Sequence, residues 1–362
     1  MNKRTTYRML TAGYPPRATA LWLRETYFPE IIRRFNEESS RKRFGLYQGE
    51  QIPVNERNLT DVRTRMGVLI EFELARISNE LLDGLKINNI FWAYVVANRF
   101  PDLEIRNNSG ERKLRFEIKS LQCIAEEKSA NFDTLKKDIN PLTDFVVVCL
   151  WDWSKERSAT YQWDSVPIIH KVYVFHAYSL TMLRDTYWLN NPPSDMGNGY
   201  QGFDIRYAVT CKNGIYSKEQ GNYGKLTRIW KDEFRYRPTE TEELLDTEQE
   251  YLNFQEEIIF EGFKILATTH LSSLAPNTTI EEVRENNDVI GYKAEQYIYL
   301  SSKIQNTRTN LQRIVSNNNC SILVKMTEKY QPKIYKLEDN SLSLIFEDIK
   351  KPKYVLDILN QI

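Results

Sequence analysis

The sequence lacks the features that mark membrane, secreted and nucleotide-driven proteins. No apolar run reaches the roughly 20 residues of a membrane-spanning helix, and the first residues have no apolar core of a secretory signal. The 4 cysteines are scattered without paired spacing and the 3 histidines form no cluster, which argues against a disulfide framework or a zinc site. No glycine-rich loop ends in Lys-Ser or Lys-Thr, so we expect no nucleotide cofactor. These absences favour a cytoplasmic protein in a reducing compartment, without a membrane segment.

Net charge is also missing, because 49 basic residues balance 49 acidic ones, but the charges are unevenly placed. Residues 1–48 hold ten Lys and Arg against four Asp and Glu, whereas residues 241–362 hold thirteen against nineteen. A nucleic-acid-binding protein with this balance must concentrate its positive charge in a cleft. An ordinary solvated surface explains the asymmetry equally well.

The stretch 101–122, PDLEIRNNSGERKLRFEIKSLQ, predicts a β-hairpin. Apolar and charged residues alternate on both sides of Asn107-Asn108-Ser109-Gly110, whose residue types favour a tight turn. Because side chains alternate between the faces of a strand, Glu117 and Lys119 are expected on one face. The hairpin returns Asp102 to their side. Two carboxylates beside an ammonium group suit a hard divalent cation and a phosphate.

Four of these residues match a known motif. Pro101, Asp102, Glu117 and Lys119 resemble the motif of the PD-(D/E)xK nuclease superfamily, and within it the Type II restriction endonucleases. The resemblance covers about residues 60–180. It implies a Mg²⁺-dependent, site-specific endodeoxyribonuclease that cuts double-stranded DNA and leaves 5′-phosphate and 3′-hydroxyl ends. It also implies that Mn²⁺ can substitute for Mg²⁺, that the enzyme is a homodimer, and that its host is a prokaryote.

The resemblance also assigns roles to single residues. Asp102, Glu117 and the carbonyl group of Ile118 would bind the metal, and Lys119 would position the attacking water. A glutamate from the preceding helix, Glu71, would complete the site or hold a second metal. Asp102, Glu117, Lys119 and Glu71 are therefore the expected catalytic residues.

A long helix is expected after residue 59, with Asn58 or Thr60 as its cap. Its apolar stripe is formed by residues at helical spacing: Val62, Met66, Ile70, Leu74, Ile77 and Leu81. The resemblance implies that Gly67 in this helix permits close packing, although a helix can also simply tolerate a glycine. By periodicity Glu73 falls inside the stripe and Glu71 on its flank, so periodicity favours Glu73 as the metal-site carboxylate and the family resemblance favours Glu71.

The order of expected elements predicts an α/β fold, a restriction-endonuclease-like mixed β-sheet core flanked by helices. Residues 1–59 form a mostly helical, basic N-terminal segment, in which Pro29 is expected to end or kink a first helix. Residues 60–238 form the catalytic domain with a loop-rich insertion, and 239–362 an α+β accessory domain for dimerisation or DNA recognition. In the core, 87–100 are a helix or a strand, 124–139 a helix, and 144–151 and 171–180 buried strands. In the last region, 255–267, 280–285 and 293–315 are expected as helices, followed by strands at 321–326, 333–337 and 342–346.

Basic and amide side chains outside the hairpin are candidates for contacts with DNA phosphates and base edges. These are Arg63, Arg65, Gln122, Lys212, Lys225 and Arg228. Two other readings of the chain stay open. One is a repair, recombination or CRISPR-linked nuclease of the same superfamily; the other is a DNA-binding protein without catalysis, in which the hairpin charges only pair with each other.

Overall fold

The structure is a computed structural model. It describes residues 1–11, 14–40, 60–95, 100–123, 138–153, 166–190, 260–327, 332–347 and 354–362, together with Phe132, Thr134, Asn253 and Ile349. The chain divides into two compact units, Met1–Phe254 and Gln255–Ile362. The expected boundary between 238 and 239 lies outside the described residues. In those that are described, no helix is long and apolar enough to cross a lipid bilayer.

The first unit is built on a five-stranded mixed sheet in the order β1-β2-β3-β4-β5. The strands are β1 (Ile90–Tyr94), β2 (Leu103–Asn107), β3 (Arg112–Gln122), β4 (Asp144–Trp153) and β5 (Pro167–His176). The β3–β4 pair is parallel and the other pairs are antiparallel. The predicted hairpin is confirmed as β2 and β3, and Gly110 in its turn has a φ of 83° that favours glycine. The ambiguous apolar run 87–100 contains a strand.

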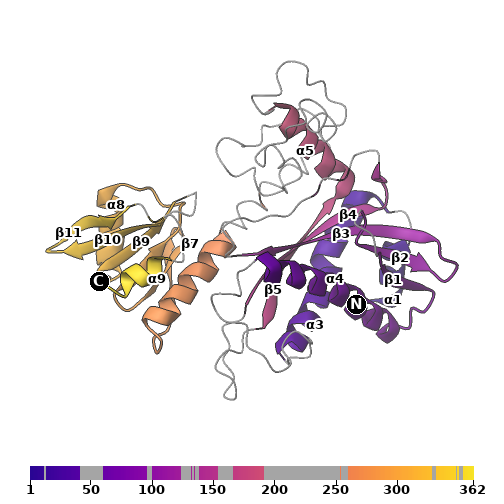
Figure 1. The fold of residues 1–362 in the computed structure, drawn as a ribbon, viewed down its shortest axis with the longest axis horizontal. Helices are drawn as coiled ribbons and strands as arrows, with labels where there is room; N and C mark the ends of the chain where they lie inside the picture. The colour runs from indigo at the N-terminus through magenta and orange to yellow at the C-terminus, as the bar shows by residue number, and fades with distance from the viewer. Residues whose placement is uncertain are drawn as a thin grey trace. The chain divides into compact units, whose positions relative to one another are not determined.

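Helices cover one face of this sheet (Figure 1). They are α1 (Lys3–Thr11), α2 (Pro16–Trp22), the π-helical turn η1 (Leu23–Tyr27), α3 (Phe28–Ser40) and α4 (Thr60–Gly84). The apolar side chains of α3 and α4 share one core with those of the sheet, including Phe116 and Ile118 of β3. Within the described part of the basic N-terminal segment, residues 1–11 and 14–40, the apolar side chains are thus part of the sheet's own core. On leaving β5 the chain enters α5 (Ala177–Asn190), which contacts β4 and β5.

Proline chemistry explains the break in the N-terminal helices. Pro29 has no N–H to donate to the carbonyl group four residues earlier, so a regular helix cannot run through it. The π-helical turn Leu23–Tyr27 ends two residues before Pro29, and the N–H of Phe28 donates to the carbonyl group of Leu23, five residues back. The prediction that Pro29 ends a first helix is wrong, because α3 begins at Phe28 and contains Pro29; the regular helix is instead interrupted by the π-helical turn just before it.

The long helix and the buried strand were both predicted from apolar patterns. In α4, the stripe residues Met66, Ile70, Leu74, Ile77 and Leu81 are buried as expected. Nine of the 10 residues of β4 are buried, which fits a strand covered on both faces. The helix expected at 124–139 lies almost wholly outside the described residues. Together, α4 and β3 supply the positions on which the site depends.

The second unit is a six-stranded sheet in the order β11-β10-β9-β8-β7-β6, with β8 and β9 parallel. After a helix over residues 260–274, its elements are β6 (Glu281–Glu285), β7 (Asp288–Ala294), β8 (Tyr297–Leu300), α8 (Arg308–Asn317), β9 (Ile322–Met326), β10 (Pro332–Glu338), β11 (Ser341–Phe346) and α9 (Tyr354–Leu359). The helix predicted at 280–285 is wrong, and so is most of that at 293–315. The last three strands are confirmed.

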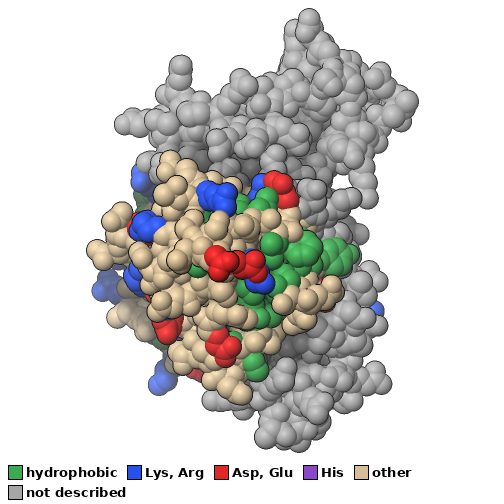
Figure 2. Space-filling model, turned by 90° about the vertical axis from the view of Figure 1, so that its left-hand side faces the viewer, with side chains coloured by type: hydrophobic (Ala, Val, Ile, Leu, Met, Phe, Trp, Pro, Cys, Tyr) green, Lys and Arg blue, Asp and Glu red, His purple; other side chains and the backbone are tan. Residues whose placement is uncertain are grey.

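The outer strand β11 leaves three hydrophobic side chains exposed, those of Leu344, Ile345 and Phe346. The space-filling view in Figure 2 shows hydrophobic side chains gathered beside acidic ones on one face of the molecule. A sheet edge with exposed hydrophobic side chains is a surface on which other chains can pair.

Candidate active site

The candidate site lies where β2 and β3 separate. β3 has 11 residues and β2 has 5, so β3 continues past the start of β2 while it remains paired with β4. The last backbone bond between the two strands joins the N–H of Asp102 to the carbonyl group of Phe116, at 3.0 Å. Beyond this point, the edge of β3 that faces β2 has no strand beside it among the described residues. The fork places β3 side chains next to the first residues of β2.

The side chain of Asp102 continues the hydrogen-bond ladder between β2 and β3. Its Oδ2 accepts a hydrogen bond from the backbone N–H of Ile118 at 2.8 Å, where a longer β2 would have supplied a carbonyl oxygen. The carboxylate is thereby held against β3, since a charged acceptor makes a stronger bond than a neutral one. The interaction fixes one carboxylate oxygen and leaves Oδ1 for other contacts.

Glu117 and Lys119 lie on the face of β3 opposite to Ile118, as the alternation predicted. The side chain of Ile118 lies in the core beneath α3 and α4, whereas Lys119 Nζ contacts Glu117 Oε1 at 2.7 Å. The same Nζ atom lies 4.0 Å from Asp102 Oδ2. The structure therefore brings Asp102, Glu117 and Lys119 into one cluster.

The ammonium group of Lys119 is held between carboxylates. Burial by itself opposes the charged form, but Glu117 and Asp102 outweigh it, and together they raise the pKa of Lys119 above its ordinary value. The side chain is 19% exposed, so the positive charge is fixed in place and still reachable from solvent. Such an amine can donate hydrogen bonds to a phosphate oxygen or a water molecule.

A third carboxylate reaches the cluster from α4, and it belongs to Glu71. Burial raises the pKa of Glu71 to about 7, and the negative charge of Asp102 adds to the effect. Glu73 lies on another part of the helix, where it forms an ion pair with Arg76 at 2.7 Å. The structure thus places Glu71 beside the hairpin residues and gives Glu73 a partner on its own helix.

Several contacts hold α4 and β1 in position around Glu71. An added Cβ atom at Gly67 would lie 3.0 Å from Ser120 Oγ of β3, so glycine permits the close approach of helix and strand. Tyr94, at the end of β1, places its hydroxyl group where it can donate a hydrogen bond to Glu71, and its ring stacks on that of Phe72 with ring centroids 4.1 Å apart. The N–H of the next residue, Val95, bonds to the carbonyl group of Asp102 at 2.8 Å. Tyr94 therefore links the helix carboxylate to the sheet carboxylate.

Sequence reasoning missed Tyr94 and Ser120. Tyr94 sits inside an apolar run whose secondary structure is ambiguous from sequence, and its partner Glu71 lies 23 positions earlier. Ser120 follows Lys119, and its sequence context indicates only a strand residue. A polar hydroxyl at the end of an apolar strand, shortly before the Pro101-Asp102 motif, was the available signal for Tyr94.

The expected DNA contacts have mixed outcomes. Arg63 is half-buried and Arg65 exposed on the first turns of α4, whereas Gln122 is 3% exposed and its Nε2 donates to Asp152 Oδ1 at 3.1 Å. Gln122 therefore braces the end of β3 against β4 and is not displayed on the surface. The remaining three candidates, Lys212, Lys225 and Arg228, lie outside the described residues.

The carboxylate oxygens of the cluster are of the type that Mg²⁺ prefers as ligands. Among the described residues, no three His, Cys, Asp or Glu side chains converge closely enough to hold a metal ion by themselves. Mg²⁺ needs fewer, because it commonly takes one or two carboxylates and fills its other positions with waters and substrate phosphate oxygens. Asp102 and Glu117 offer this hard oxygen set, and the charge of Lys119 now neutralises part of it.

Comparison with protein-family models, curated protein sequences and solved structures finds no match to this chain.

Proposed function

We propose that the protein is a Mg²⁺-dependent endodeoxyribonuclease with a PD-(D/E)xK site and a restriction-endonuclease-like catalytic core. The observation that carries the proposal is the convergence of Asp102, Glu117 and Lys119 at the fork between β2 and β3. Lys119 Nζ lies 2.7 Å from Glu117 and 4.0 Å from Asp102. A lone surface salt bridge would explain a pair, but not a third carboxylate brought in by α4.

Each residue has a task in this proposal. Asp102 and Glu117 hold the ion, with the Ile118 carbonyl group as a further oxygen. Bound Mg²⁺ would neutralise charge on the scissile phosphate and lower the pKa of a water molecule. Lys119 donates hydrogen bonds to that phosphate and orients the attacking water, and its fixed charge favours the anionic transition state. Hydrolysis then leaves 5′-phosphate and 3′-hydroxyl ends.

Glu71 acts with the hairpin residues. Its carboxyl is half-protonated near pH 7, so it can accept a proton or a share of the ion's charge as the reaction requires. Tyr94 keeps this carboxyl pointed at the cluster through its hydroxyl group. Cutting both strands of a symmetric site calls for two copies of the site, so the active species in this proposal is a homodimer.

The test is incubation of the purified chain with phage DNA and Mg²⁺. Discrete fragments that disappear with EDTA support a site-specific endonuclease, with Mn²⁺ expected to replace Mg²⁺. A smear would point to a repair, recombination or CRISPR-linked nuclease of the same superfamily. Intact DNA, from a protein that still binds it, would overturn the catalytic proposal. The matched control is Lys119→Ala, which should bind DNA but leave it uncut.

A further inference from the structure

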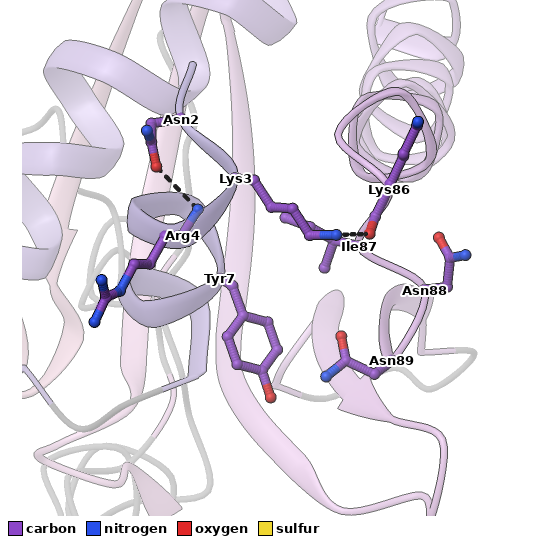
Figure 3. Close-up of a pocket in the computed structure, with 8 residues that line it drawn as sticks. All are labelled: Asn2, Lys3, Arg4, Tyr7, Lys86, Ile87, Asn88 and Asn89. Atoms are coloured by element: carbon purple, nitrogen blue, oxygen red, sulfur yellow. Dashed lines mark hydrogen bonds between the residues drawn. The ribbon is translucent and has the colours of Figure 1, made fainter.

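A second surface of the first unit gathers positive charge away from the candidate active site. It is a hollow of about 780 Å³ between the start of α1 and the connector from α4 to β1 (Figure 3). Its lining comprises Asn2, Lys3, Arg4, Tyr7, Lys86, Ile87, Asn88 and Asn89. Three of these residues are cationic and none is acidic. We call this surface the basic hollow.

The cations of the basic hollow differ from many others in the first unit. Arg33 and Arg34 pair with Glu30, and Arg115 with Asp144. Among the described residues, no carboxylate pairs with Lys3, Arg4 or Lys86. Their charge is not neutralised by this part of the chain and is available to an anion.

The floor of the basic hollow is fixed by hydrogen bonds. Lys3 Nζ donates to the carbonyl group of Lys86 at 2.5 Å, which joins α1 to the connector. The N–H of Asn108, in the β2–β3 turn, donates to the carbonyl group of Asn89 at 3.2 Å, and its side chain donates to the carbonyl group of Asn88. The connector is thus held from both sides, and a ligand would meet a preformed surface.

The helix end itself is not the binding group. The Oδ1 atom of Asn2 accepts hydrogen bonds from the N–H groups of Arg4 and Thr5. The backbone carbonyl group of Asn2 accepts a hydrogen bond from the N–H group of Thr6. These first amides of α1 are therefore used. An anion would be held by side chains, and the two remaining N–H bonds of Lys3 Nζ are among the donors.

The arrangement of the cations indicates the kind of anion. In Figure 3 the side chains of Arg4 and Lys86 point away from each other, from opposite rims of the hollow. Cations that diverge cannot enclose one small phosphate, but they can contact successive phosphates of an extended backbone. The amides of Asn88 and Asn89 and the ring of Tyr7 add neutral contacts of the kind made to sugar and phosphate.

We propose that the basic hollow binds backbone phosphates of duplex DNA and so anchors the substrate of the proposed nuclease, on which this inference rests. Glu71 and the end of α4 are 13 residues apart, about 20 Å along the helix axis. One turn of duplex DNA is about 34 Å long. A duplex with one phosphate at Asp102 and Glu117 is therefore long enough for other phosphates to reach the residues that follow the end of α4, Lys86 among them.

The test measures DNA binding without cleavage, by fluorescence anisotropy of a labelled duplex in EDTA at salt concentrations from about 50 to 200 mM. The variants are Arg4→Gln and Lys86→Asn. Lys86 has a φ of 56°, a left-handed conformation that asparagine also tolerates, so Lys86→Asn removes the charge without adding strain. The matched control is Arg33→Gln with Arg34→Gln, which removes the same charge from cations already paired with carboxylates.

Removal of one phosphate-binding cation should reduce the slope of log Kobs against log salt by about 0.9, and the double variant should reduce it by about 1.8. The control should keep the wild-type slope. If the variants bind DNA with the wild-type slope, the inference is overturned. It is also overturned if the variants lose binding of inorganic phosphate but bind DNA as the wild-type protein does. The nuclease proposal fails separately, if wild-type protein binds the duplex and does not cut it with Mg²⁺.

Discussion

Glu71→Gln should raise the stability of the folded chain above neutral pH while it lowers DNA cleavage. Burial and the charge of Asp102 raise the pKa of Glu71 from 4.5 to about 7, so the folded protein binds a proton more tightly there than the unfolded chain does. The contribution of Glu71 to the free energy of unfolding is therefore fully present below pH 4.5, and it is lost as the pH rises from 4.5 to 7. The pKa difference corresponds to at most about 3 kcal/mol, which partial solvent exposure reduces to roughly 1–2 kcal/mol. Glutamine carries no charge, so Glu71→Gln should recover this amount at pH 8.

The assay is urea unfolding of both proteins at several pH values between 4.5 and 8.5. As the pH rises, the free energy of unfolding of the wild-type protein should fall below that of Glu71→Gln. Near pH 4.5 the two values should be similar. The matched control, Glu73→Gln, removes an ion pair with Arg76 instead and should cost no more than about 1 kcal/mol. If Glu71→Gln is no more stable than wild type at pH 8, then burial and the charge of Asp102 do not raise the pKa of Glu71, and the reasoning is refuted.

Metal binding gives a second readout of the same cluster. A divalent cation favours the ionised form of Glu71, so adding Mg²⁺ at pH 7 should release up to roughly half a proton per site from wild-type protein. Glu71→Gln should release less, and its gain in Tm with Mg²⁺ should be smaller. Equal proton release by the two proteins would show that Glu71 does not face the ion. DNA cleavage by Glu71→Gln should fall, whereas Glu73→Gln should still cut.

Three further predictions concern the geometry of the site. Lys119→Ala should abolish cleavage and leave DNA binding largely intact, as a gel-shift assay beside a digest would show; retained cutting would remove the water-positioning role. Tyr94→Phe keeps the stack on Phe72 but removes the hydroxyl bond to Glu71, so cleavage should fall several-fold with little change in Tm. Gly67→Ala alone should not gain the roughly 1 kcal/mol that alanine gives in a helix, because its Cβ meets Ser120 Oγ at 3.0 Å. With Ser120→Ala added, that gain should appear in the free energy of unfolding measured with urea. If the effects of the two substitutions on this free energy are additive, Gly67 and Ser120 are not in close contact.

The hairpin and α4 were predictable because their signals are local. Alternation of charged and apolar residues around Asn107–Gly110 defines β2 and β3, and a stripe at helical spacing defines α4. The choice between Glu71 and Glu73 was not local. It depends on the direction from which α4 meets β3, and the contact of Gly67 with Ser120 decides that direction.

The errors in the second unit have a similar physical cause. Residues 280–315 combine apolar and charged residues in a pattern that fits either a helix or short strands. Asn286 and Asn287 have φ values of 51° and 71°, the conformation of a two-residue hairpin turn between β6 and β7. Adjacent asparagines were the signal for this turn, and the interpretation of the region as helix overlooked it.

The charges of the candidate site explain why its parts depend on one another. With all groups ionised, Asp102, Glu117 and Glu71 carry three negative charges against the one positive charge of Lys119. That excess is what a divalent cation would balance. Without one, burial and the negative charge of Asp102 raise the pKa of Glu71 to about 7, so that protonation of this carboxyl reduces the excess. The fork between β2 and β3 makes this arrangement stable, because Asp102 also replaces the missing strand partner of Ile118. Asp102→Asn should then preserve the fold and abolish any gain in Tm with Mg²⁺, since an amide oxygen can still accept from the N–H of Ile118 but carries no charge.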